Sequence, residues 1–314
     1  MARKSRKNRS KKNKTKKSWE KMNCHPNTKN KTISNKSCYD RDIIMKIKNA
    51  YNKNHMNKIY SHEPKEVWKK LRKNIKHCNK EDCWLDELND NGEKQKVDDL
   101  LFSPDRPKSW DDNPNAWLSN YDIANVLKQY EISHPSFRLL GPSAIDYDNK
   151  PYNDEKCVWQ DLCRLSLQDL LNRNKTKLGI VFNLDKHDEP GSHWVSMFVD
   201  LDDKIIFYYD SALNPVPKQV SKLKREIIKQ GKKLEEPIEF TYLQNEYNHQ
   251  QTNTECGMYC LFFIITMLTK EVETGKMHGG RKKISKNKAI NLFLRPGIND
   301  SFMMSYRKKY FNHK

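Results

Sequence analysis

The chain has 314 residues, with 59 Lys and Arg against 40 Asp and Glu, so its formal net charge is +19. This length accommodates one sizeable domain with extensions. The longest apolar run, residues 257–268, is shorter than the ~20 residues that span a bilayer, and no apolar signal core follows Met1. We therefore expect neither a membrane-spanning nor a secreted protein. Eight cysteines are too few for a disulfide scaffold in this chain, so we expect reduced thiols.

The beginning of the chain is strongly basic. Residues 1–17 contain ten Lys or Arg and no acid, and they have no Leu, Ile, Val or Phe to bury. Because like charges repel and nothing drives collapse, residues 1–40 are predicted to form a disordered arm. The simplest interpretation is a solvated arm without a specific partner. The functional interpretations are non-specific nucleic-acid binding and nuclear targeting.

Residues 41–115 are predicted to form a helical N-terminal extension. A helix is expected to begin at Pro64, because apolar residues then recur at three- and four-residue spacing. These residues are Val67, Trp68, Leu71 and Ile75. A shorter apolar patch at residues 43–47 indicates another helix. A polar stretch with three prolines, residues 104–114, is expected to be irregular and to end the extension.

Residues 116–275 are the part of the chain richest in apolar residues, and they are predicted to form the main domain. A capping box at Ser119 and Asp122 predicts a helix there. Further helices are expected over residues 158–171 and 220–231, and strands over residues 178–184 and 238–243. Residues 276–314 are expected to be a basic C-terminal segment.

A hairpin is predicted where two β-rich runs flank Asp202 and Asp203. If Leu201 pairs with Lys204, the numbers of paired residues sum to 405. His193 and Asp210 then lie on the same sheet face as diagonal neighbours. A slip of one residue would separate them. This register therefore predicts an imidazole within reach of a carboxylate.

Cys256 directly precedes an almost wholly apolar run of helical length. A cysteine in the first turn of a helix is stabilised as a thiolate by the helix dipole, particularly beside an imidazolium, and is then a nucleophile at neutral pH. Gly257 would let a substrate backbone come close. Gln250, on the preceding loop, offers an amide donor to a developing oxyanion.

These residues resemble the ubiquitin-like-protease superfamily of cysteine peptidases, which includes SUMO proteases and the adenovirus protease. The family order is His-Trp, Asp on the next strand, Gln shortly before Cys, and Cys-Gly at the start of a central helix. The matching residues here are His193-Trp194, Asp210, Gln250 and Cys256-Gly257. The segments 117–123, 141–146 and 253–258 look more like polyprotein proteases of large cytoplasmic DNA viruses than like cellular SUMO proteases.

The resemblance implies an α+β fold of the papain-like, adenovirus-protease type, with a small mixed sheet packed on a central helix that begins at Cys256. It implies a thiol endopeptidase in which His193 and Asp210 activate Cys256, and Gln250 with the Cys256 backbone holds the oxyanion, without metal or cofactor. The expected substrates are viral structural polyproteins cleaved after small pairs such as Gly-Gly. The expected location is the virion or the virus factory in host cytoplasm; a non-viral protein would be intracellular or nuclear.

Two positions depart from the family pattern. Glu255 stands where many relatives carry Asp. Gln251 adjoins Gln250, so the choice of Gln250 as oxyanion donor rests on its six-residue spacing from Cys256.

Other interpretations stay open for single features. His77, Cys78 and Cys83 form a partial zinc pattern without a second cysteine pair. Cys260 is expected to be a buried core residue. The tryptophans are expected to pack rather than to stack on bases: Trp68, Trp84, Trp110, Trp117 and Trp159.

Three alternative functions use the same residues. A deconjugating protease would act on ubiquitin-like modifiers, and a basic packaging protein would bind nucleic acid on an inactive protease fold. Acetyl transfer through the same Cys occurs on a related fold.

Overall fold

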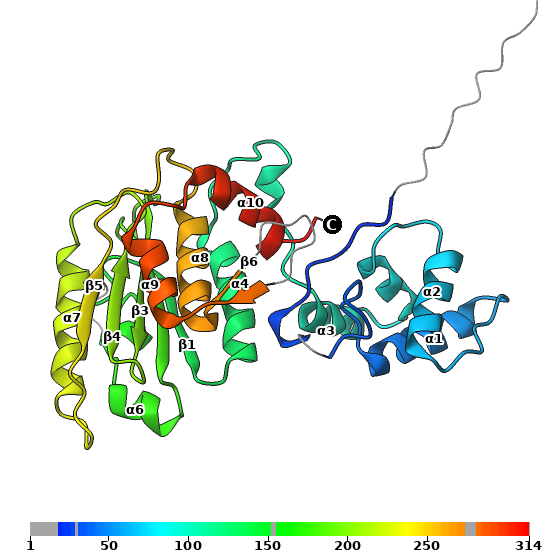
Figure 1. Cartoon of the computed structure of the whole chain (residues 1–314), viewed down its shortest axis with the longest axis horizontal. Coiled ribbons are helices and arrows are strands. Elements are labelled where there is room, and N and C mark those ends of the chain that lie inside the picture. The colour runs from blue at the N-terminus through cyan, green and yellow to red at the C-terminus, as the bar shows by residue number, and fades with distance from the viewer. Residues whose placement is uncertain (1–17, 29–30, 152–154, 274–280, 314) are drawn as a thin grey trace, which may run out of the picture. The chain divides into compact units, whose positions relative to one another are not determined.

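The structure is a computed structural model that describes residues 18–28, 31–151, 155–273 and 281–313. Of the arm predicted to be disordered, residues 1–40, the first 17 lie outside the described part. The prediction is wrong for the described residues after them, because Met22, Cys38 and Tyr39 are buried. The chain divides into two compact units. One comprises residues 1–22 and 30–98, and the other comprises residues 23–29 and 99–314. Figure 1 shows the elements of both.

The N-terminal unit is helical, as predicted. It contains α1 (Arg41–Asn54), α2 (Pro64–Asn74), the 3-10 helix η2 (Asp82–Glu87) and most of α3 (Asn91–Leu101). Trp68 and Trp84 are buried and lie beside Trp19 and each other, so their prediction as packing residues is confirmed. Glu81 is buried in the same unit and accepts hydrogen bonds from Trp68 Nε1 at 2.6 Å and from the backbone N–H of Cys38 at 2.8 Å.

The second unit is built on a five-stranded mixed sheet of order β1-β2-β3-β4-β5. The strands are β1 (Phe137–Ala144), β2 (Lys177–Asn183), β3 (Trp194–Asp200), β4 (Ile205–Tyr209) and β5 (Thr241–Gln244). The outer pairs β1·β2 and β4·β5 are parallel, and the two inner pairs are antiparallel. A two-stranded ribbon, β6 (Glu271–Glu273) with β7 (Arg281–Lys283), follows later in the chain.

The β3–β4 hairpin has the predicted register. Ser196 pairs with Tyr209 and Asp200 with Ile205, so the residue numbers sum to 405. The connection is longer than predicted, because residues 201–204 form turns rather than strand. Lys204 has a φ of 55°, which closes this turn in a left-handed conformation. The register survives because both strands are buried and a slip would reverse their faces.

Helices cover both faces of the sheet (Figure 1). On one face, α8 (Cys256–Thr269) packs against β3, with α4 (Asn120–Ser133), α9 (Lys286–Leu294) and α10 (Asp300–Tyr310) around it. On the other face lie α7 (Lys218–Gly231) and the short helices α5 (Gln160–Cys163) and α6 (Leu167–Asn172). Nearly all of α8 is buried, as expected of a central helix. The predicted α+β fold with a mixed sheet on a central helix is confirmed.

Some elements differ from the predictions. The helix expected over residues 158–171 is two helices, because Ser166 caps a new helix by accepting a hydrogen bond from the N–H of Asp169. β1 was not predicted, since Gly141 and Pro142 interrupt its pattern. The C-terminal segment, expected only to be basic, contains α9 and α10, which pack on α8. Two further 3-10 helices are η1 (Pro26–Thr28) and η3 (Lys108–Trp110).

The expectation that all cysteines are reduced is wrong: Cys24 and Cys38 are disulfide-bonded, and two further pairs are local. Cys78 is bonded to Cys83, and Cys157 to Cys163. Their Cα atoms are 6.5 and 6.3 Å apart, within bridging range, because each pair is only five or six residues apart and spans a turn. A low cysteine content argues against a long-range scaffold but not against such local bridges. Cys256 and Cys260 are free and buried.

Candidate active site

His193 and Asp210 lie at the same end of the β3–β4 hairpin. His193 directly precedes β3 and Asp210 directly follows β4, and antiparallel pairing brings these two positions together. His193 Nε2 lies 2.6 Å from Asp210 Oδ1, and Asp210 is 1% exposed. The predicted proximity of these two side chains is confirmed.

Both oxygens of Asp210 are fully engaged. Oδ1 also accepts the N–H of Ala212 at 2.9 Å, while Oδ2 accepts the N–H and the side-chain amide of Asn214 at 2.9 and 3.0 Å. Asn245 holds the backbone of Asp210, accepting its N–H at 3.0 Å and donating to its carbonyl at 2.7 Å. These contacts fix the carboxylate so that one lone pair points at His193.

The charges of this group are coupled. Burial raises the pKa of Asp210, but the hydrogen bond and the positive charge of His193, together with the hydrogen bonds from Ala212 and Asn214, outweigh burial and lower it. Burial lowers the pKa of His193, yet hydrogen bonds to Asp210 and Cys256, and their charges, raise it from 6.5 to about 9. Because Nε2 faces Asp210, Nδ1 is the ring nitrogen left for the Cys256 sulfur.

Cys256 is the first residue of α8, as predicted. The preceding Glu255 is completely buried and forms a bidentate ion pair with Arg307 of α10, whose Nε and Nη2 lie 3.0 and 2.7 Å from the two carboxylate oxygens. Arg307 Nη1 also donates to the carbonyls of Pro114 and Ala116 at 2.9 and 3.0 Å. Arg307 therefore neutralises the charge beside the sulfur and anchors the start of α8.

The structure distinguishes Gln250 from its neighbour. Gln250 is buried; its Oε1 accepts the Ser211 hydroxyl at 2.7 Å, and its Nε2 donates to the Thr252 carbonyl at 2.6 Å. One amide N–H of Gln250 is thus left for a ligand. Gln251 is exposed, and its side chain donates to the Asn248 carbonyl. This geometry favours Gln250 as the oxyanion donor.

Gly257 is explained by packing. A Cβ at this position would lie 3.1 Å from Leu118 Cβ and 3.4 Å from Ile123 Cδ1. The missing side chain therefore lets α8 approach the start of α4 closely.

A cavity of about 430 Å³ adjoins His193 through its neighbour in the chain, Trp194. Trp117 and Trp159 also line it, together with Pro142 and Pro190. Trp117 is 40% exposed and lines the cavity rather than the core, so its prediction as a packing residue is wrong. Trp194 Nε1 donates to the Leu118 carbonyl at 3.0 Å, which fixes the indole ring at the wall.

The loop that carries His193, residues 184–193, is tied at several points. Asp146 accepts the backbone N–H of His187 at 3.0 Å, and its other oxygen lies 2.8 Å from His187 Nδ1. Asn183 Oδ1 accepts the N–H of Ser192 at 3.1 Å, next to His193. Gly191, at a φ of 97°, donates its N–H to Asp185 at 3.0 Å. The loop thus forms a fixed wall of the cavity.

The described residues contain no group of three or more His, Cys, Asp or Glu arranged to hold a metal ion. Within the same residues, no helix is both long and apolar enough to cross a membrane.

Residues 171–304 match the Ulp1 protease family, C-terminal catalytic domain. The chain is 30% identical over 174 residues to a thiol protease of Acanthamoeba polyphaga mimivirus, covering 55% of each protein. It is 28% identical over 162 residues to a cysteine protease of African swine fever virus, covering 48% of this chain and 58% of that protein. The chain thus matches little more than half the length of these relatives.

The fold is that of a solved viral protease. The crystal structure of an African swine fever virus protease superposes with a TM-score of 0.62 at 19% identity, covering 93% of this chain and 96% of that one. The predicted resemblance to the ubiquitin-like-protease superfamily, and to the proteases of large cytoplasmic DNA viruses, is confirmed.

Several site residues had no signal in the sequence. Asn245 and Arg307 act on their partners across 35 and 52 residues, and neither lies in a motif. Asn214 could have been predicted from the sequence. It follows Asp210 by four residues, which is close enough for its side-chain amide to donate to the Asp210 carboxylate within one turn.

Proposed function

We propose that the chain is a thiol endopeptidase that processes viral structural polyproteins after small residues such as Gly-Gly. The observation that carries this proposal is the series Asp210, His193, Cys256: His193 Nε2 lies 2.6 Å from Asp210, the interaction with Cys256 raises the pKa of His193, and the sulfur lies in the first turn of a buried helix. A nucleophile, a base and an orienting carboxylate in this order perform acyl transfer.

The reaction begins with a thiolate at Cys256 and an imidazolium at His193, held by Asp210. The sulfur attacks the substrate carbonyl, and the oxyanion accepts hydrogen bonds from the Cys256 N–H and the Gln250 amide. His193 gives its proton to the leaving amine as the peptide bond breaks. It then takes a proton from water, which attacks the thioester; the C–S bond breaks, the acid leaves, and the Cys256 thiolate is restored beside the His193 imidazolium.

Selection of small residues is assigned to the cavity beside Trp194. Three indole rings and two prolines leave about 430 Å³ for the acyl side of the substrate. Rigid aromatic walls reject branched side chains by overlap, whereas glycine passes. The tied loop 184–193 keeps that width constant.

The test is labelling of the purified chain by a Gly-Gly-based electrophilic probe under reducing conditions. Labelling is expected at Cys256 and is expected to disappear in Cys256→Ala. The matched control is Cys260→Ala, one helical turn further and equally buried, which should label normally. Labelling that persists in Cys256→Ala would contradict the proposal. Cleavage of ubiquitin-like conjugates but not of viral precursors would favour deconjugation instead.

We also propose that residues 1–17 bind nucleic acid without sequence preference, since ten cations occur there without an acid. The enzyme would then act in the virion or the virus factory, where such polyanions and the precursors occur together. DNA affinity of the full chain should fall steeply with salt and be lost on deletion of residues 1–17, with Gly-Gly probe labelling intact. Equal affinity without residues 1–17 would contradict this assignment.

A further inference from the structure

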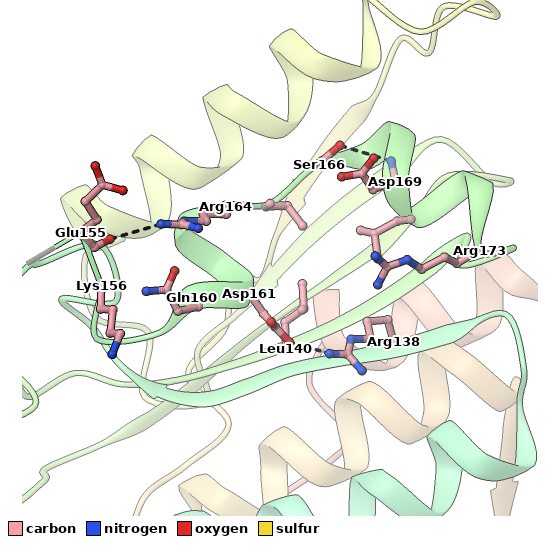
Figure 2. Close-up of a pocket in the computed structure, with 12 residues that line it drawn as sticks. Arg138, Leu140, Glu155, Lys156, Gln160, Asp161, Arg164, Ser166, Asp169 and Arg173 are labelled. Carbon is pink, nitrogen blue, oxygen red and sulfur yellow. Dashed lines mark hydrogen bonds and ion pairs between the residues drawn. The ribbon is translucent and has the colours of Figure 1, made fainter.

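A second cavity, of about 700 Å³, lies between β1 and the short helices α5 and α6 (Figure 2). Its lining includes none of the four proposed catalytic residues and none of the residues around Trp194. Leucine side chains form an apolar part of the wall, namely Leu140, Leu165 and Leu170. These leucines belong to the core on the α7 side of the sheet, so the wall is fixed.

The charged groups on the rim differ in how far they are neutralised. Arg138 already forms two ion pairs: its guanidinium lies 3.1 Å from Glu131 and 2.5 Å from Asp161. Arg164 and Arg173 follow α5 and α6 as their C-cap residues and are exposed. Figure 2 shows them at opposite ends of the cavity.

Both of these guanidinium groups keep donors for a ligand. Arg164 Nη2 makes one long hydrogen bond, 3.4 Å, to the backbone carbonyl of Glu155. Within the described residues, Arg173 has no ion pair or hydrogen bond from its side chain. Two such guanidiniums suit two carboxylates, because each presents a planar set of donors.

The third feature of the cavity is a buried acceptor that lacks a hydrogen-bond donor. Gln160 Oε1 is buried at the cavity wall and accepts no hydrogen bond. A buried acceptor without a donor is unfavourable, so a bound N–H would be favoured at this point. A peptide backbone supplies such a group, whereas a phosphate or a free carboxylate does not.

We propose that this cavity binds an extended peptide segment in which an apolar side chain stands between acidic residues. The apolar side chain contacts the leucines, the carboxylates pair with Arg164 and Arg173, and a backbone N–H reaches Gln160. Glu155 and Asp169 share the rim, so ligand carboxylates are accepted only at Arg164 and Arg173, and a ligand with negative charge along its whole length, such as nucleic acid, would meet like charges between them.

The segment is assigned to the protein substrate, and this part rests on the proposed function. Neighbouring residues of one segment line the two cavities: Val158 and Trp159 belong to the one beside Trp194, and Gln160 and Asp161 to the larger one. A substrate in the first cavity is therefore one short segment of chain away from the second. Such a second contact raises the affinity of the enzyme for an intact protein substrate without changing the chemical step.

The test measures peptide binding to the full chain carrying Cys256→Ala, so that catalysis is not needed. The probe is a fluorescent peptide with one leucine between two pairs of acidic residues, and its counterpart has lysines in place of the acids. The acidic probe should bind, and Arg164→Glu with Arg173→Glu should weaken its affinity at least tenfold. The matched control is Arg225→Glu, an exposed arginine on α7, which should change affinity less than twofold.

Two outcomes would overturn the proposal: equal binding of both peptides, or unchanged affinity in the double variant. Competition by single-stranded DNA that depends on Arg164 and Arg173 would reassign the cavity to nucleic acid. In the active chain, Gly-Gly probe labelling should be unaffected by the double variant, while KM for a precursor protein rises. Loss of labelling in the unmodified chain would instead count against the proposed function.

Discussion

Each unit of the molecule contains a carboxylate that is almost completely buried, Glu81 in one and Asp210 in the other, and the pKa values of these two shift in opposite directions. Glu81 in the N-terminal unit and Asp210 in the second unit are both 1% exposed. Burial raises the pKa of Glu81 above 4.5, although Ser37, Cys38 and Trp68 donate hydrogen bonds to it. Asp210 is also buried, but its pKa is lowered below 3.8.

The pKa values of these two carboxylates shift in opposite directions because their hydrogen-bond partners differ in charge. The donors to Glu81 are neutral, so they lower its pKa by less than desolvation raises it. Asp210 faces His193, whose positive charge compensates the carboxylate directly. A buried carboxylate thus stays ionised where an imidazolium stands opposite, and we expect Asp210 to serve the reaction and Glu81 to serve folding.

The largest expected effect is on kcat, which should distinguish the role of Asp210 in the reaction from the role of Glu81 in folding. Asp210→Asn keeps the shape of the side chain but removes the charge opposite His193, so kcat on a Gly-Gly substrate should fall about 10²–10⁴-fold. The matched change Glu81→Gln should leave kcat within about twofold of the unmodified chain, because no site residue depends on it. Similar losses in both variants would mean that the carboxylates are equivalent.

The next effect concerns stability at the start of α8. Arg307→Met leaves Glu255 buried without its counter-charge, so unfolding in urea should become easier by about 3–5 kcal/mol. The double change Arg307→Met with Glu255→Met should recover much of this loss, since no charge is then buried. If the double variant is as unstable as the single one, the packing of Arg307, and not its charge, anchors the helix.

The pKa of His193 predicts a dependence of stability on alkaline pH. Because its folded-state pKa is raised from 6.5 to about 9, its contribution is complete below pH 6.5 and is lost as pH rises through 9. The free energy of unfolding should fall by about 3 kcal/mol across this range. His193→Gln should flatten this part of the curve, as followed by urea unfolding at each pH. A decline that persists in His193→Gln would assign it to another group.

The amino-acid pattern predicted the parts of the site that depend on short-range rules. The hairpin register followed from pairing Leu201 with Lys204 across the turn at Asp202 and Asp203, and it placed His193 beside Asp210. The position of Cys256 followed from the helix start. Both rules act over a few residues, so one sequence is enough to apply them.

The remaining contacts join segments whose proximity only the complete fold creates. Arg307 reaches Glu255 across 52 residues, and Trp117 meets Trp194 at one cavity. β1 was missed because Gly141 and Pro142 are poor strand formers, and the sequence does not show that this strand lies at a sheet edge, where proline is tolerated. Local propensity does not carry this information, since burial and ion pairing in three dimensions decide it.

The smallest expected effect returns to Glu81. Because its folded-state pKa is raised, its contribution to stability is complete below pH 4.5 and declines as pH rises through the raised value. Glu81→Gln is neutral and of similar shape, so it should remove this acidic-side decline at a cost of about 1 kcal/mol for altered hydrogen bonding. Urea unfolding between pH 4 and 7 would measure it. A steeper decline in Glu81→Gln would show that Glu81 is ionised in the folded unit, and the contrast with Asp210 would then be lost.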